Sequence, residues 1–203
     1  MHWRNEREWA LWEDRVIDGV PYNFTHLRSF DMPLLRPARG EWAEFRATVR
    51  VVFDCHVVTE GVEHIVRNHP AYWLDTGGKG RKFVPERYRY SLTLPNLITA
   101  LPTGKIKCYM AKRDNYMVWE EGEGEDKAHY QAFFDIYKPA NQPADGSYLL
   151  ILYVQSAYLK DDPYARQRKN EKVFAQLCAQ LAGVIERKPK GPRVAINKKK
   201  NKR

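Results

Sequence analysis

His56 is the side chain best suited to acid–base chemistry, because an imidazole exchanges a proton near neutral pH. It lies in residues 42–59, WAEFRATVRVVFDCHVVT, which are the strongest strand candidate in the chain. Residues two apart share one face of a strand, so Asp54 is expected beside His56, where its carboxylate would orient the ring. Cys55 then falls on the opposite, apolar face. A hydrogen-bonded structural histidine is the alternative interpretation.

Cations and tyrosines are concentrated between residues 79 and 91, which we call the basic–aromatic segment. Its members are Lys79, Arg81, Lys82, Arg87, Tyr88, Arg89 and Tyr90. Basic groups hold a phosphate backbone and tyrosine rings stack on unpaired bases, so this composition suits RNA. In strand geometry the two late arginines share one face and the two tyrosines share the other, and the tyrosine face is also compatible with a core position.

Motifs for metal or cofactor binding are weak in this sequence, and we expect neither a metal nor a cofactor. Residues 76–80, TGGKG, lack the GxxxxGK[ST] frame, so they are predicted to form a mobile loop, with phosphate contact as the alternative. Cys55-His56, His64 and His69 are spaced CH-x7-H-x4-H, which matches no zinc module. Strand alternation would also separate Cys55 from His56.

The formal net charge of +9 belongs to one end of the chain. Residues 187–203 hold nine Lys or Arg and no acid, so 34 − 9 leaves 25 basic and 25 acidic residues in 1–186. We expect a disordered basic tail on a neutral body.

Three cysteines without a CxxC pair indicate a reducing compartment. With no long apolar run and no signal-peptide pattern, a cytoplasmic protein without membrane contact is predicted.

The predicted fold class is α+β, with one domain built on a mostly antiparallel twisted sheet of about six or seven strands. Asp18-Gly19 predicts a hairpin, and Leu94–Leu101 with Pro95 predicts a short inserted helix. An apolar stripe over 164–186 predicts a long C-terminal helix. The expected organisation is a Trp-rich segment and hairpin over 1–40, a sheet core over 41–160, the helix over 164–186 and the tail over 187–203.

From about residue 45 to 160 the chain resembles the superfamily of small RNases that includes barnase, EndoU, colicin and RelE nucleases, in particular its phage and toxin-like branches. The resemblance is carried by His56, Lys82, Arg87, Leu94-Pro95-Asn96-Leu97-Ile98 and Val154-Gln155-Ser156-Ala157-Tyr158. It implies RNA cleavage without a metal, with His56 as acid–base group and Arg87 and Lys82 on the phosphate. Ser156 and Tyr158 would position the phosphate through their hydroxyls.

The resemblance leaves the second acid–base group unidentified, and His64, Tyr90 and His129 are the candidates for it. The substrate-binding set expected around the catalytic residues comprises Lys79, Arg81, Lys82, Arg89 and Tyr90.

The functional hypothesis is an RNA-interacting protein, either a metal-independent endoribonuclease or an inactive relative of one. RNA would bind the basic–aromatic segment and the 187–203 tail, and a protein partner such as an antitoxin would fit a toxin-like chain. The alternative is a non-catalytic phage or mobile-element accessory protein. Such a protein would hold nucleic acid through the tail and Arg166–Lys172, or bind another protein through Trp3, Trp9 and Trp12.

Overall fold

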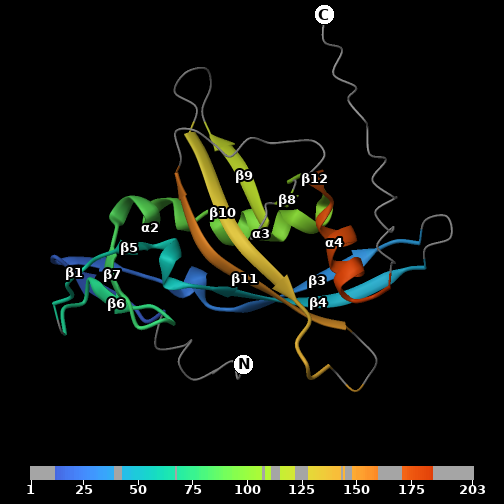
Figure 1. Cartoon of the computed structure of the whole chain (residues 1–203). Helices are drawn as coiled ribbons and strands as arrows, with labels where there is room; N and C mark the ends of the chain where they lie inside the picture. The colour runs from blue at the N-terminus through green and yellow to red at the C-terminus, as the bar shows by residue number, and fades with distance from the viewer. Residues whose placement is uncertain are drawn as a thin grey trace, which may run out of the picture.

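A computed structural model describes residues 12–38, 43–66, 68–106, 108–110, 115–121, 128–142, 144, 148–159 and 171–184. Within these residues the strands form three sheets, of seven, three and two strands. Figure 1 shows the small sheets at one end of the molecule and helix α4 at the other. No helix in the described ranges combines the length and the apolar character needed to cross a bilayer.

The large sheet has the strand order β12-β8-β9-β10-β11-β4-β3. Its strands are β3 (Phe30–Arg36), β4 (Phe45–Phe53), β8 (Cys108–Met110), β9 (Asn115–Glu121), β10 (Ala128–Tyr137), β11 (Tyr148–Leu159) and β12 (Glu171–Lys172). All neighbours pair antiparallel except β11 and β4, which run parallel. Strand β11 lies inside the sheet, as its continuous apolar run predicts.

The two small sheets lie beside the end of β4. One is the hairpin of β1 (Arg15–Ile17) and β2 (Val20–Tyr22). Asp18 and Gly19 turn it with positive φ angles of 51° and 79°, which confirms the predicted tight turn. The other pairs β5 (Thr59–Gly61), β7 (Gly80–Phe83) and β6 (Tyr72–Leu74), in that order. The sequence did not predict this second sheet.

The helices are short. The α-helices are α2 (Pro85–Ser91), α3 (Leu94–Ala100) and α4 (Phe174–Leu181), and the 3-10 helices are η1 (Thr25–Leu27), η2 (Cys55–Val57) and η3 (Leu101–Thr103). Helix α3 confirms the predicted inserted helix, with Pro95 in its first turn. Gly104 follows η3 with φ of 74°, a left-handed conformation that glycine adopts at no steric cost.

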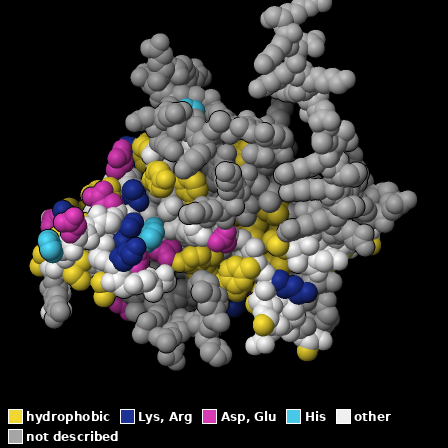
Figure 2. All heavy atoms as spheres, viewed as in Figure 1, with side chains coloured by type: hydrophobic (Ala, Val, Ile, Leu, Met, Phe, Trp, Pro, Cys, Tyr) yellow, Lys and Arg dark blue, Asp and Glu magenta, His cyan; other side chains and the backbone are white. Residues whose placement is uncertain are grey.

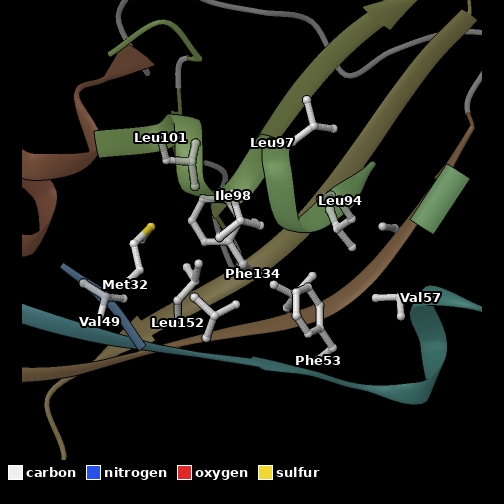
Figure 3. Packing of buried hydrophobic residues seen from close by; sticks show 14 of the residues in the cluster. Met32, Val49, Phe53, Val57, Leu94, Leu97, Ile98, Leu101, Phe134 and Leu152 are labelled. Atoms are coloured by element: carbon white, nitrogen blue, oxygen red, sulfur yellow. The ribbon is translucent and has the colours of Figure 1, made fainter. Parts of the chain in front are cut away.

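The hydrophobic core lies between α3 and one face of the large sheet. Figure 3 shows Leu94, Leu97, Ile98 and Leu101 above side chains from β3, β4, β10 and β11. Fully burying one such aliphatic or aromatic side chain contributes about 1.5–3 kcal/mol. Trp12 is also fully buried, which agrees with an N-terminal segment docked on the core, whereas Trp3 and Trp9 lie outside the described residues.

The predicted α+β class with a long C-terminal helix is wrong. Strands dominate the described residues and divide among three sheets, and Glu171–Lys172 forms β12 against β8. Helix α4 begins only at Phe174, after Val173, which is 40% exposed and therefore off the apolar stripe. The helix ends before Gly183, whose φ is 79°. Residues 164–170, 185 and 186 lie outside the described ranges, as does the tail.

Two further expectations near the candidate site are corrected by the structure. The strand predicted over 42–59 stops at Phe53, and a 3-10 turn follows it. Residues 85–91 of the basic–aromatic segment form α2 rather than a strand, because Pro85 occupies the first helical position that suits proline. The strand-based assignment of Arg87 and Arg89 to one face and Tyr88 and Tyr90 to the other is therefore wrong.

Candidate functional site

The site begins where β4 ends and β11 continues. Phe53 pairs with Val154, and the Asp54 N–H then donates to the Val154 carbonyl at 2.9 Å. Beyond that point β11 runs on to Leu159 with β10 on one side only, and η2 and α2 pack against it. A bulge between Phe133 and Phe134 shifts the register of β10 against this part of β11. At this end of β11, side chains from η2 and α2 therefore meet those of the strand.

His56 reaches this end of β11 because Asp54 caps the short helix η2. The Asp54 side chain accepts the backbone N–H of His56 at 3.2 Å, as an N-cap aspartate does. A 3-10 helix turns once in three residues, so neighbouring side chains do not alternate between faces. The predicted separation of Cys55 from His56 is therefore wrong, and the ligand atoms of Asp54, Cys55 and His56 all lie within 4.8 Å of one another.

Two carboxylates surround the imidazole of His56. Its Nε2 lies 3.2 Å from Asp75 Oδ2 and 3.7 Å from Asp54 Oδ1. The side chains of His56, Asp54 and Asp75 are 31%, 6% and 9% exposed, so the ring alone reaches solvent to any extent. Tyr153 donates a hydrogen bond from its hydroxyl to the second oxygen of Asp54. Burial raises the pKa of the Cys55 thiol, and the nearby Asp54 carboxylate raises it further.

The glycine-rich loop after β6 holds a carboxylate of the chain itself. Asp75 Oδ1 accepts backbone N–H groups from Gly77 and Lys79, each at 2.9 Å. Burial alone would raise the pKa of Asp75, but the hydrogen bonds from Lys79, His56 and Gly77 together lower it below its ordinary value. The phosphate cradle considered from the sequence is thus occupied in part by Asp75, which comes immediately before the loop.

Arg87 ties α2 to the segment that carries His56. Its Nη1 donates to the carbonyl oxygens of His56 at 3.1 Å and Thr59 at 2.6 Å. Arg81 donates to the same Thr59 carbonyl at 3.0 Å through Nη2. Burial lowers the pKa of Arg87 and the nearby Arg81 charge lowers it further, while Glu60 opposes the shift. Two guanidinium groups therefore converge beside His56.

A cavity of about 220 Å³ opens next to Arg87. It is lined by Glu60, Val84, Glu86, Arg87, Tyr90, Tyr130, Tyr158 and Leu159. The Arg87 guanidinium lies 5.1 Å from the centre of the Tyr158 ring, and Tyr90 stacks on Tyr130 with centroids 5.6 Å apart. Figure 2 shows Lys and Arg side chains beside a histidine and acidic groups over the β5–β7 and α2 end of this face.

The structure brings together five of the side chains singled out from the sequence: His56, Arg81, Arg87, Tyr90 and Tyr158. It leaves the other four at the periphery. Lys79 and Lys82 are exposed, and Arg89 is exposed with its Nη2 donating to the Tyr90 hydroxyl at 3.1 Å. Ser156 pairs with Phe133 in β10, and in the described part of the chain no hydrogen bond joins its hydroxyl to His56 or Arg87.

Three candidates were available for a second acid–base group. Tyr90 lines the cavity, His64 is exposed after β5, and His129 lies in β10. The cavity also includes Glu60, which the sequence reasoning missed although it stands only four residues after His56.

Sequence reasoning also missed Asp75, Tyr130 and Tyr153. Asp75 precedes a glycine-rich loop, which is a usable signal for an aspartate that accepts loop N–H groups. Tyr130 and Tyr153 lie in strands whose pattern indicates only burial, so no local signal marks them.

Comparison with known families gave one finding, a match of residues 14–182 to the YjaZ family. The match runs from β1 to α4 and therefore includes every element of the site. Neither the curated proteins nor the solved structures contained a match.

Proposed function

The chain belongs to the YjaZ family, and from its site we propose that it binds RNA and cleaves it without a metal ion. The observation that carries this proposal is the hydrogen bond from Arg87 Nη1 to the His56 carbonyl at 3.1 Å. It holds the guanidinium of the phosphate-binding candidate against the backbone of the residue that carries the acid–base candidate, although 31 residues separate them in the chain. A single phosphate can meet both groups only if they are neighbours.

The proposed reaction is an internal transfer at phosphorus. A base takes the proton of a ribose 2′-hydroxyl, the 2′-oxygen bonds to the adjacent phosphorus, and the bond to the 5′-oxygen breaks as an acid gives that oxygen a proton. His56 and Glu60 are the two groups assigned to proton transfer, because Glu60 lines the cavity and acts electrostatically on Arg87. Glu60 thus takes the role that His64, Tyr90 and His129 were considered for.

Arg87 and Arg81 are assigned to the phosphate. Negative charge grows on the phosphate oxygens in the transition state, and guanidinium groups fixed in a partly dry site stabilise that charge. Both arginines are half-buried and held by the Thr59 carbonyl, so they do not need to be ordered when substrate arrives. Lys79, Lys82 and Arg89 are exposed and would add long-range attraction to the RNA backbone.

The tyrosines of the cavity supply flat surfaces for unpaired bases. Tyr158 lies under Arg87, and Tyr90 is half-buried at the cavity wall. A volume of about 220 Å³ is below the ~300–1,000 Å³ of pockets that enclose a drug-sized ligand. It therefore suits one nucleotide of a single strand, with the rest of the RNA outside. A cytoplasmic location and a protein partner such as an antitoxin belong to the same proposal.

The test is cleavage of total RNA by the purified protein in EDTA. The wild type is expected to cleave, and His56→Ala is expected to be slower by about 10²–10⁴-fold, the usual contribution of a general acid or base. His64→Ala is the matched control, because His64 is an exposed histidine outside the site. Intact RNA with the wild type, or equal rates for the wild type and His56→Ala, would overturn the proposal.

A further inference from the structure

The surroundings of His56 hold more buried negative charge than positive charge. Asp54 and Asp75 are 6% and 9% exposed at their side chains, and both approach the same imidazole nitrogen. In the described part of the chain neither carboxylate has a Lys or Arg within salt-bridge distance. Buried carboxylates in proteins are normally paired with a cation or coordinate a metal ion. The single imidazole between them can balance at most one of the two negative charges.

The distances from the imidazole nitrogen to the two carboxylates are close to the edge of a metal coordination tetrahedron. Zinc bound to His nitrogen or carboxylate oxygen at about 2.0–2.1 Å requires ligand atoms about 3.3 Å apart. His56 Nε2 lies 3.2 Å from Asp75 Oδ2 and 3.7 Å from Asp54 Oδ1. Each of these two distances is within a few tenths of an ångström of the value that an ion shared by the pair of atoms requires.

Each carboxylate is also held as a metal-ligating carboxylate is usually held, by a hydrogen bond to its outer oxygen. Asp75 Oδ1 accepts N–H groups from Gly77 and Lys79, which leaves Oδ2 facing the imidazole. Tyr153 donates to Asp54 Oδ2, which leaves Oδ1 on the side of His56. Each carboxylate therefore keeps one oxygen directed at the imidazole nitrogen through hydrogen bonds to its other oxygen.

We propose that Asp54, His56 and Asp75 form a binding site for a divalent transition-metal ion, with Zn²⁺ as the ion that best suits two carboxylates and one imidazole. Imidazole disfavours Mg²⁺, which prefers oxygen ligands in octahedral geometry. The partial exposure of His56 leaves one coordination position open to solvent. Because the ion would occupy the Nε2 lone pair, Zn²⁺ would inhibit RNA cleavage, and this second part rests on the proposed function.

Binding is tested on the full chain with no RNA present. Competition with a chromogenic zinc chelator is expected to give one Zn²⁺ per chain and no comparable Mg²⁺ binding. His56→Gln and Asp75→Asn are each expected to weaken Zn²⁺ binding by at least about tenfold. Asp31→Asn and His64→Ala are the matched controls and should bind as the wild type does, because neither residue is near the three ligands. Far-UV circular dichroism checks that every variant is folded.

Two results would overturn the metal site: absence of stoichiometric Zn²⁺ binding by the wild type, or binding that His56→Gln and Asp75→Asn leave unchanged. RNA cleavage with and without Zn²⁺ then separates the two proposals. If the chain binds Zn²⁺ but never cleaves RNA, the metal site is supported and the proposed nuclease activity is refuted. If the chain cleaves RNA in EDTA but binds no Zn²⁺, the nuclease activity is supported and the metal site is refuted.

Discussion

Arg87 stabilises the site by donating hydrogen bonds to two backbone carbonyl groups. Its Nη1 donates to His56 and Thr59, so α2 and η2 are joined through a single guanidinium group. The planar fork of arginine has donors that a lysine ammonium cannot place in the same way. The same group faces Tyr158 and the cavity, so its structural and proposed functional roles use different sides of one side chain.

Replacing Arg87 by lysine tests that dual role. Arg87→Lys is expected to lower the free energy of unfolding by about 1–2 kcal/mol, because one or both charged hydrogen bonds are lost. Urea-induced unfolding measures the change. Arg89→Lys is the matched control, since Arg89 is exposed in the same helix, and its unfolding curve should coincide with that of the wild type. Equal stability of Arg87→Lys and Arg89→Lys would contradict the assignment.

Asp75 makes stability sensitive to acid. The hydrogen bonds that outweigh its burial lower the pKa of Asp75 in the folded chain below the ordinary value of about 3.9. Its stabilising contribution is therefore complete above that value and disappears as the pH falls through the folded pKa. Asp75→Asn should flatten the loss of unfolding free energy between about pH 5 and 2. Thermal melts across this pH range measure it, and unchanged pH slopes in the variant would refute it.

The sequence pointed to His56 and Arg87 from residue type, and in the structure the Arg87 guanidinium donates to the backbone carbonyl of His56. It could not identify their neighbours, because Asp75 and Tyr153 approach from β6–β7 and β11, and only the tertiary fold sets that proximity. Ser156 was selected with Tyr158, yet only Tyr158 lines the cavity. Both residues follow the bulge between Val154 and Ser156 and are two apart on one face of β11, so their distance along the strand, which no local pattern reports, separates them.

At the scale of elements, the predictions succeeded where pattern and turn chemistry agreed. The hairpin at Asp18-Gly19 and the helix at Pro95 combine both signals. They failed for α2, where two signals conflict. The Arg-Tyr-Arg-Tyr sequence has the two-residue period of a strand, whereas Pro85 stands where a helix can begin, and the segment is helical. The last helix was predicted too long because its range included Glu171–Lys172, which form β12, and continued past Gly183, where the helix ends.

The sheet β5-β7-β6 depends on the absence of a side chain at Gly80. A Cβ there would overlap Ile65 Cγ2 and crowd the Val62 carbonyl. Gly80→Ala is therefore expected to lower the free energy of unfolding by about 1–3 kcal/mol. Gly61→Ala in β5 is the control, since its Cβ would meet only the Arg81 side chain at an ordinary distance of 3.4 Å. Chemical denaturation of both variants decides, and a Gly80→Ala variant as stable as the control would be the contrary result.

For the whole molecule, the basic charge and the site are separate features. The +9 comes from residues 187–203, whereas residues 1–186 have balanced charge. A cationic appendage raises affinity for any polyanion without selecting one. Specificity, if RNA is the substrate, has to arise at Arg81, Arg87 and the cavity tyrosines.

Deleting residues 187–203 tests this division. The truncated chain is expected to bind RNA with lower affinity and with a smaller dependence on salt, because fewer counterions are released. Its melting temperature and its cleavage products should match those of the full chain. Filter binding across a salt series measures the slope. An unchanged slope, or an altered cleavage pattern, would show that the charge and the site are not independent.

The parallel pairing of β4 with β11 has a consequence for the order in which the site is made. The Asp54–Tyr153 hydrogen bond joins residues 99 positions apart, and Tyr158 comes later still. During translation, His56 and residues 79–91 are therefore synthesised well before the strand that completes their surroundings. The nascent chain carries the basic groups without Tyr153 on Asp54 or Tyr158 under Arg87. The surroundings of His56 and Arg87 are therefore complete only after β11 has been synthesised.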